Sequence, residues 1–268
     1  MTVTMRRNPA ALALAVLAGA LLALPQVSWA AASPKPALDS ASAQNAQQRD
    51  AEARLNKSQF DNVRVSVADG IATLTGSVQL YEYKADAAKR VLRAKGVQAV
   101  RNLIQVGGPS ISDKQLQDKL VEQLTYDRVG YGNAFNAISV EVHNGVVTLG
   151  GHARTYVDRD SALALVDTTP GVKDVINDVQ VDPVSIMDDQ IRLEVARAIY
   201  GYPLLHKYAI DPAKPIRISV QNGHVSLYGV VDSKGDKDAA FLRANGVPGV
   251  FSVKNYLQVA NQPTEAQK

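Results

Sequence analysis

Histidine is the side chain best suited to acid–base catalysis or metal binding, and this chain has four of them. His143 and His224 lie beside predicted turns, His152 follows a predicted hairpin, and His206 lies in a loop. No pair has the spacing H-x-x-x-H or H-x-x-E with which a helix presents two ligands on one face. We therefore interpret these histidines as exposed or structural, and predict no metal site, no cofactor and no catalytic residue.

Other catalytic motifs are equally scarce. The chain has no cysteine, so it has no thiol nucleophile, and the serine-hydrolase pattern G-x-S-x-G is absent. Gly130-Tyr131-Gly132 lacks the third glycine and the preceding strand of a nucleotide-binding loop, so we interpret it as a turn. Asp188-Asp189 is an acidic pair at a predicted helix start, where carboxylates complement the helix dipole. The sequence thus predicts a protein that is not an enzyme.

Two long loops combine aromatic, apolar and basic side chains, as surfaces that bind lipid headgroups or a protein partner do. They span 125–136 and 200–215, and Phe135 belongs to the first. With two lysines of the preceding helix, the candidate surface consists of Lys114, Lys119, Tyr126, Arg128, Tyr131, Tyr200, Tyr202, Leu204, Leu205, Lys207 and Tyr208. The alternative is that these loops close the end of a core or form contacts between repeats.

The elements that would position these loops come from a threefold repeat. The pattern V-x-V-x-V-x-[DN]-G-x-x-[TS]-L-x-G begins at Val63, and recurs from Ile138 and Ile216 with some Val-to-Ile exchanges. Each copy is followed by G-V-x-x-V-x-N-x-x-Q-V, whose glycine lies 20 residues beyond the last glycine of the hairpin. Equivalent positions are 75 and then 78 residues apart, so one structural unit is used three times.

Each hairpin pattern predicts two strands joined by a tight turn. The central dipeptides Asp69-Gly70, Asn144-Gly145 and Asn222-Gly223 accept positive φ at both positions. Apolar residues alternate on both sides of the turn, which predicts one buried and one solvated face. Gly76, Gly151 and Gly229 continue the buried register, and we interpret them as close approaches of a helix or as bulges.

The remaining elements are helices and one more strand. Second helices are predicted over 82–95, 157–168 and 234–245, with small residues (Ala87, Ala162, Ala240) at one offset. Third strands follow from 97, 172 and 250, and the length of the crossover allows a parallel return. First helices in repeats two and three start at the acidic residues near 113 and 188, whereas repeat one predicts only a short or frayed helix. The fold class is α+β: three tandem α-β-β-α-β modules, each a small three-stranded mixed sheet with helices packed on one face.

The N-terminal 30 residues have a basic start (Arg6, Arg7), an apolar run over 10–24 and small residues up to Ala30. This order predicts a secretory signal peptide, cleaved after Ala30 or Ala32. An uncleaved anchor is the alternative, but the run is shorter than the roughly 20 residues of a membrane-spanning helix. Cleavage lowers Lys+Arg from 29 to 27 against 26 Asp+Glu, so the charge gives no support for nucleic-acid binding. Without cysteine the chain cannot be a lipoprotein, and we expect a periplasmic protein with no transmembrane segment after cleavage.

The predicted organisation is a signal peptide (1–30), a flexible leader (31–46), three units (47–107, 112–183 and 187–260) and a polar tail (261–268). The repeated motifs resemble the BON domain family, small modules of bacterial envelope proteins. The resemblance covers about 210 of 268 residues and implies a periplasmic or outer-membrane-associated protein, similar to osmotically induced periplasmic BON proteins. It also implies phospholipid binding, attributed in some members to a first helix, or support of envelope protein biogenesis.

We therefore expect a non-enzymatic periplasmic protein that binds an anionic phospholipid surface and supports envelope integrity or stress tolerance. The first helices and long loops of units two and three are the expected contact surface. The alternative is a periplasmic chaperone or adaptor for envelope protein clients.

Overall fold

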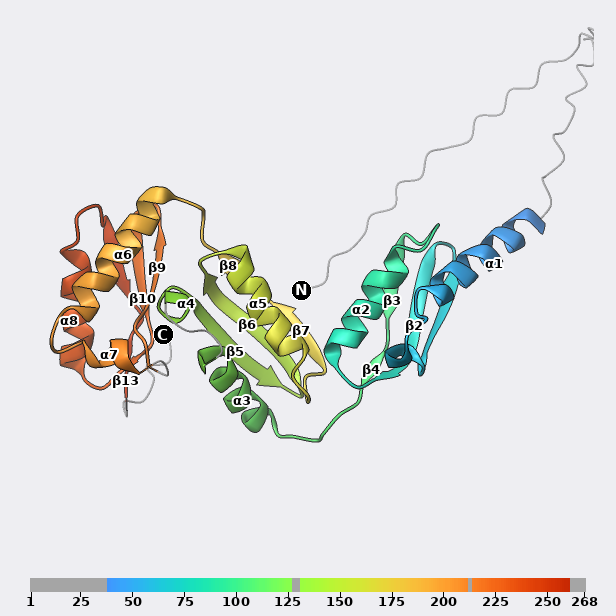
Figure 1. Ribbon diagram of the computed structural model, residues 1–268, viewed down its shortest axis with the longest axis horizontal. Coiled ribbons are helices and arrows are strands. Elements are labelled where there is room, and N and C mark those ends of the chain that lie inside the picture. The colour runs from blue at the N-terminus through green and yellow to red at the C-terminus, as the bar shows by residue number, and fades with distance from the viewer. Residues whose placement is uncertain (1–37, 127–130, 212–213, 261–268) are drawn as a thin grey trace, which may run out of the picture.

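The computed structural model describes residues 38–126, 131–211 and 214–260, and three units of helices and a small sheet follow one another along its long axis (Figure 1). The predicted signal peptide and polar tail lie outside the described residues. Unit 1 consists of α1 (Leu38–Ala53), a 3-10 turn (Ser58–Phe60), β1 (Val63–Ala68), β2 (Ile71–Val78), α2 (Tyr81–Leu92), β3 (Ala99–Asn102) and β4 (Gln105–Val106).

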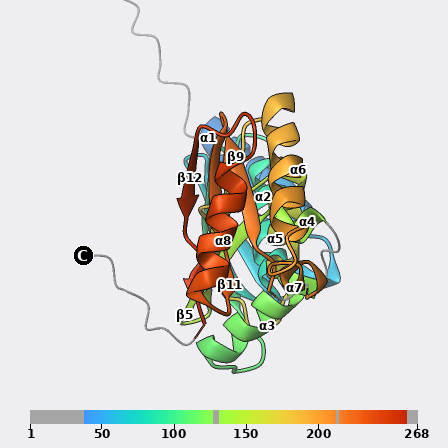
Figure 2. The ribbon, with the colours of Figure 1, turned by 90° about the vertical axis from the view of Figure 1, so that its left-hand side faces the viewer.

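Units 2 and 3 repeat this order with a short helix in place of the 3-10 turn, and unit 3 has one more short strand. Unit 2 consists of α3 (Asp113–Tyr126), α4 (Tyr131–Ala134), β5 (Ala137–His143), β6 (Val146–Ala153), α5 (Tyr156–Asp167), β7 (Asp174–Asn177) and β8 (Gln180–Val181). Unit 3 consists of α6 (Ile186–Tyr200), α7 (Lys207–Ile210), β9 (Arg217–Gln221), β10 (His224–Tyr228), β11 (Val230–Val231), α8 (Lys234–Asn245), β12 (Ser252–Asn255) and β13 (Gln258–Val259). Figure 2 shows α6 and α8 side by side at the end of the molecule.

The sheet topology confirms the predicted α+β modules. In each unit the second hairpin strand is central, antiparallel to the first strand and parallel to the strand that returns after the helix. The turn dipeptides adopt positive φ at both positions, for example 54° at Asn144 and 78° at Gly145, as two-residue hairpins require. The small residues of the second helices, Ala87, Ala162 and Ala240, are fully buried against the sheets.

The third strand of each unit is divided, which the sequence did not predict. In unit 1, β3 pairs with residues 71–74 of β2 and β4 pairs with residues 77–78. The repeated asparagine causes the division, because Asn102 Oδ1 accepts from the backbone N–H of Ile104 at 3.2 Å and so turns the chain. Asn102 Nδ2 also donates to the Lys84 carbonyl in α2 at 2.8 Å, which ties the strand to the helix.

The first helix of unit 1 corrects the sequence prediction. α1 begins at Leu38, inside the segment predicted as a flexible leader, and the prediction of a short or frayed helix is wrong. Apolar periodicity failed here because glutamine side chains attach the helix: Gln48 Nε2 donates to the Val65 carbonyl at 2.7 Å, and Gln48 Oε1 accepts from the Val67 N–H at 2.8 Å. Ala51 is the residue of this helix that lies in the core of unit 1.

The position of Gln48 recurs in each unit and covers the outer edge of the sheet. Gln117 Nε2 of α3 donates to the Val140 carbonyl at 2.9 Å, and Arg192 NH2 of α6 donates to the Val220 carbonyl at 3.1 Å. The first strand of each unit therefore has its free backbone groups partly satisfied by the preceding helix, which lowers the tendency of an edge strand to pair with another chain.

The glycines that end the three hairpin patterns, Gly76, Gly151 and Gly229, lie against the backbone of the facing strand segment. Gly76 and Gly151 have φ of 108° and 85°, and a Cβ built on them would lie 1.9 Å from the Asn62 carbonyl oxygen and 2.0 Å from that of Ala137. The close neighbour is thus the backbone where the first strand begins, and the interpretation as a helix approach is wrong. The interpretation as a bulge is also wrong for Gly151, because the pairing of β5 with β6 continues through it without an extra residue. Glycine is required here because it accepts both the positive φ and the close contact with the facing strand.

Candidate functional site

The loop of unit 3 that the sequence proposed as a surface is partly a core element. Leu205 is fully buried and Tyr208 is 3% exposed, and both belong to the apolar core of unit 3. Their assignment to a lipid or partner surface is therefore wrong, because a side chain enclosed by its own unit cannot contact a ligand. Aromatic and apolar residues in a loop do not by themselves show whether the loop forms a binding surface or closes the core.

Tyr208 and Lys207 fix this loop to the start of α8. Tyr208 Oη donates to Asp236 Oδ2 at 2.6 Å and accepts from the Asp232 N–H at 2.7 Å. Lys207 Nζ lies 2.8 Å from carboxylate oxygens of both Asp232 and Asp236. Burial, and then the hydrogen bond to Asp236, raises the pKa of Tyr208 to about 12, while the bonds to Asp232 and Asp236 raise the pKa of Lys207. Lys207 is thus occupied by ion pairs within the unit.

The other candidates in this loop differ in exposure. Tyr200 is partly buried and its Oη donates to the Ile216 carbonyl at 2.6 Å, and burial raises the pKa of its hydroxyl. Tyr202 and Leu204 are exposed, and the Arg243 guanidinium of α8 lies 5.3 Å from the centre of the Tyr202 ring. Tyr202 and Leu204 are therefore accessible to a partner, as is the half-exposed, ion-paired Lys207.

A prediction tests the structural role of this loop. The change Tyr208→Phe removes a donor from the buried Asp236 carboxylate and an acceptor from the Asp232 N–H, so we expect a loss of about 1–2 kcal/mol in the free energy of unfolding. Urea denaturation measures it. Tyr202→Phe is the matched control, because the Tyr202 side chain is exposed and lies outside the core of unit 3. An equal loss in both variants would contradict the structural role of the Tyr208 hydroxyl.

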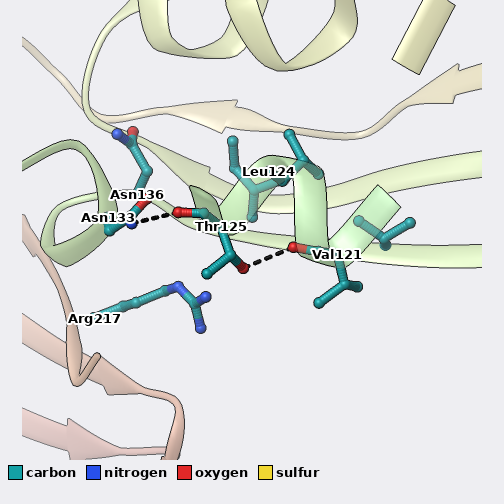
Figure 3. Close-up of a pocket in the computed structure, with 8 residues that line it drawn as sticks. Val121, Leu124, Thr125, Asn133, Asn136 and Arg217 are labelled. Atoms are coloured by element: carbon teal, nitrogen blue, oxygen red, sulfur yellow. Dashed lines mark hydrogen bonds between the residues drawn. The ribbon is translucent and has the colours of Figure 1, made fainter. Parts of the chain in front are cut away.

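The corresponding loop of unit 2 makes the contact with unit 3. Phe135 is 2% exposed and lies in the core of unit 3, which confirms for this residue the alternative that the loops join the units. Asn133 Nδ2 donates to the Thr125 carbonyl at 2.6 Å, and Arg217 of β9 points toward them (Figure 3). The pocket in this figure, at about 40 Å³, has room for a water molecule or two rather than a substrate.

The remaining candidates of unit 2 are dispersed. Tyr126, at the end of α3, is exposed, Tyr131 begins α4, and Arg128 lies outside the described residues. Lys114 and Lys119 lie on the exposed side of α3, where Lys114 Nζ pairs with Asp118 at 3.0 Å. Of the described candidates, Lys114 and Lys119 lie along the body of α3 and Tyr126 at its end, so they are spread over the length of this helix.

The acidic pair of α6 is structural. Asp188 is 2% exposed, and its carboxylate accepts from the N–H groups of Asn222 and Gly223 at 2.9 and 2.8 Å, so it holds the hairpin turn of unit 3. Asp113 has the same role in unit 2, and the N–H groups of Asn144 and Gly145 lower the pKa of its carboxyl.

A buried polar network that the sequence did not reveal joins units 2 and 3. Asp182, whose side chain is fully buried, lies 3.2 Å from Arg192 NH2, accepts from Gln221 Nε2 at 2.9 Å and from Ser219 Oγ at 3.1 Å, and lies 3.4 Å from His152 Nδ1. Burial raises its pKa, but the hydrogen bonds from His152 and Gln221 and the charge of Arg192 outweigh burial, so the pKa is lowered. The network holds the end of unit 2 against the sheet of unit 3. Among the described residues no cluster of ligating side chains suits a metal ion.

Five strongly exposed apolar side chains lie at the junction of units 2 and 3. Val184, Ile186 and Val157 are 93%, 86% and 78% exposed, and Met187 and Tyr156 are more than half exposed. We call these five residues the junction patch. They lie near one another because β6 and β8 are parallel and leave the sheet at the same edge, one toward α5 and the other toward α6. The Arg154–Asp189 ion pair, at 3.2 Å, joins the two segments.

Comparison with known proteins agrees with the three units of the structure. The BON domain matches the chain at residues 44–108, 112–183 and 188–261. The chain belongs to the BON domain family. Each match includes a first helix, a hairpin, a second helix and a divided third strand.

Among individual relatives, this BON protein is 27% identical over 124 residues to osmotically-inducible protein Y of Escherichia coli (strain K12). The match covers 45% of this chain and spans 61% of the length of that relative. Among solved structures, CdsD, a structural protein of the Type III secretion system of Chlamydia trachomatis, is 17% identical, with coverage of 79% of this chain and 90% of that one and a TM-score of 0.22. A structure of the CdsD C-terminal domain matches at 17% identity over 79% of this chain and 96% of that one, with a TM-score of 0.21.

The three BON units provide an internal comparison for the junction patch. Positions 75 residues apart are equivalent in units 1 and 2, so Tyr81 corresponds to Tyr156 and Ile111 to Ile186. Tyr81 and Ile111 pack against the core of unit 2, and burial, followed by the charge of Asp174, raises the pKa of Tyr81 to about 12. Where unit 2 meets unit 3, the equivalent residues Tyr156 and Ile186 are exposed to solvent.

Two neighbouring positions change from polar, where unit 1 meets unit 2, to apolar, where unit 2 meets unit 3, and a third changes from proline to valine. Glu82 corresponds to Val157 and Ser112 to Met187, and the exposed Pro109 corresponds to Val184. A linker that served only to join two BON units would gain solubility from polar residues at these places. The sequence signal for this site is the mainly apolar run Val184-Ser185-Ile186-Met187 at a helix start, which has none of the basic and aromatic residues that mark the two long loops.

Proposed function

We propose that this BON protein is a non-enzymatic, stress-related protein of the bacterial envelope that binds phospholipid surfaces through the junction patch. Family membership and the similarity to osmotically-inducible protein Y support the envelope and stress assignment. The observation that carries the lipid assignment is the group of five strongly exposed apolar side chains at the start of α5 and α6. Within the described residues no helix is long and apolar enough to cross a membrane.

The patch is suited to a fluid lipid interface. Side chains that are 78–93% exposed protrude from the surface, and burial of a Val, Ile or Met side chain contributes about 1.5–3 kcal/mol. Tyr156 adds an amphipathic ring of the kind that lies at headgroup depth, with the Arg159 guanidinium 5.0 Å from its centre. Insertion of four aliphatic side chains would thus offset the loss of translational freedom on binding.

The charges beside the patch indicate how strongly binding should depend on anionic lipid. Arg154 pairs with Asp189 and Arg159 pairs with Asp160, at 3.2 and 2.7 Å, so both cations are partly neutralised by neighbours. We therefore expect anionic headgroups to improve binding modestly. The apolar contribution should persist when salt screens the charges.

Co-sedimentation with liposomes of rising anionic lipid content tests this function. We expect the variant Val157→Ser/Val184→Ser/Ile186→Ser/Met187→Ser to lose at least about 100-fold in lipid partitioning, since each tenfold corresponds to about 1.4 kcal/mol. The matched control is Leu92→Ser/Leu242→Ser, which removes exposed apolar residues from α2 and α8. The control should bind as the parent does.

Two results would contradict the proposal: absence of liposome binding by the parent protein, and equal loss in the patch and control variants. A chaperone or adaptor role would instead appear as suppression of client aggregation without liposome binding. Because the four substituted side chains lie outside the cores, circular dichroism should show unchanged folding in the patch variant.

A further inference from the structure

A groove of about 500 Å³ lies on the face of the unit 3 sheet opposite to its helices. Alternate residues of β9, β10 and β12 point to this face, and His152 of unit 2 forms part of its wall. The lining is polar: it consists of serine, amide and imidazole side chains, with Lys254 as its formal charge and two tyrosines at one end. Such a lining suits a ligand with many hydroxyl groups better than an apolar one.

The polar side chains of this groove are held in place by their neighbours. Gln221 Nε2 donates to the buried Asp182 at 2.9 Å and lies 3.1 Å from His152 Nδ1. On the other strand, His224 Nδ1 lies 2.8 Å from Ser252 Oγ. Side chains held in this way lose little conformational entropy when a ligand binds.

The tyrosines form an aromatic platform that is specific to unit 3. Tyr228 and Tyr256 stack with their ring centres 5.1 Å apart at 12°, and Tyr256 is half exposed. The equivalent positions are Gly150 and Asp178 in unit 2, 78 residues earlier, and Thr75 and Leu103 in unit 1. The fold therefore does not need the aromatic pair. The electron-rich face of such a ring attracts the polarised C–H groups on the flat side of a sugar.

We propose that this groove binds a saccharide that carries an acidic group, with a sugar ring stacked on Tyr256 and the acid held by Lys254. The groove has the volume of a small-molecule site, which suits one or two sugar rings. Hydroxyl and amide groups line its length to pair with sugar hydroxyls, and the residues that line it include a lysine but no carboxylate. The acidic sugar is either a free oligosaccharide or part of a cell-wall glycan.

NMR titration of the full chain tests this site with three soluble probes: digalacturonic acid, the neutral galactobiose and inorganic phosphate. We expect digalacturonic acid to bind with shifts at the groove, galactobiose to bind more weakly, and phosphate alone to bind at least tenfold more weakly than the acidic disaccharide. Tyr256→Ser should weaken digalacturonic acid binding at least tenfold. Lys254→Gln should abolish the preference for the acidic over the neutral sugar.

Tyr202→Ser is the matched control, since it removes another partly exposed tyrosine, one that lies beside Arg243 of α8. It should leave binding unchanged. Pull-down with insoluble peptidoglycan sacculi, competed with digalacturonic acid, identifies the source: retention lost in Tyr256→Ser indicates a cell-wall glycan, and soluble binding without retention indicates a free oligosaccharide. Binding of neither, phosphate binding as tight as that of the disaccharide, or equal loss in Tyr202→Ser overturns the proposal. Liposome binding should be unaffected in Tyr256→Ser, so this proposal and the lipid function can fail separately.

Discussion

Asp182→Asn is expected to destabilise unit 3 and its junction with unit 2 by about 3 kcal/mol, because the buried Arg192 guanidinium loses its fully enclosed counter-charge and keeps only its ion pair with the partly exposed Asp189. Arg192 is 2% exposed, and its NH2 group donates to Asp182 Oδ2 at 3.2 Å. Urea denaturation followed by native-state hydrogen exchange measures the loss. Exchange should accelerate in β9 and α6, while the core of unit 1 keeps its protection, since it lies in a separate cluster.

The same carboxylate predicts an acid dependence of stability. Because the folded pKa of Asp182 is lowered from its ordinary value of 3.8, its contribution is fully present above about pH 3.8 and is lost as the pH falls through the folded pKa. The parent should therefore lose stability below that pH. Asp182→Asn should lose less over the same interval.

Two variants complete this test. Asp160→Asn breaks an exposed ion pair with Arg159 and should change the free energy of unfolding by less than about 0.5 kcal/mol. Asp182→Asn/Arg192→Gln should recover part of the loss, because glutamine at this helix position binds the edge strand in units 1 and 2. A double variant no more stable than Asp182→Asn would show that the buried charge is not the cause.

Gly151→Ala is expected to destabilise unit 2 by about 3 kcal/mol or more, from an unfavourable φ combined with a backbone clash. Gly151 has φ of 85°, and the new Cβ would lie 2.0 Å from the Ala137 carbonyl oxygen. The oxygen belongs to a strand whose movement would break its pairing with β6. Thermal unfolding and urea denaturation measure the effect.

The adjacent Gly150 provides a matched control. It does not have positive φ, and an added Cβ would meet the Ser139 side-chain oxygen at 3.1 Å, which can move aside. Gly150→Ala should therefore cost less than about 1 kcal/mol. Similar losses in the two variants would contradict the interpretation that the φ of Gly151 and its contact with the Ala137 carbonyl exclude a side chain.

The repeated part of the fold was predictable because it depends on local chemistry. Asn144-Gly145 encodes a turn with two positive φ values, alternating valines encode a half-buried strand, and Ala162 encodes a close helix contact. The divided third strand depends on a side chain bonding two residues ahead, and α1 is attached by Gln48 rather than by apolar residues. Hydrophobic periodicity does not detect side-chain hydrogen bonds, so it predicted neither the divided strand nor the full length of α1.

The sequence by itself determined the family, the module and its threefold use, since turn residues, periodicity and spacing act within a few residues of one another. Only the tertiary structure decided which residues are available for function. Leu205 and Tyr208 belong to a sequence motif typical of a surface, but they are buried in the core. Ile186 is exposed between units 2 and 3, whereas the equivalent Ile111 packs against the core of unit 2. The reason is physical: exposure depends on which unit packs against which, and Asp182, which holds units 2 and 3 together, acts through partners 10 to 39 residues away in the chain.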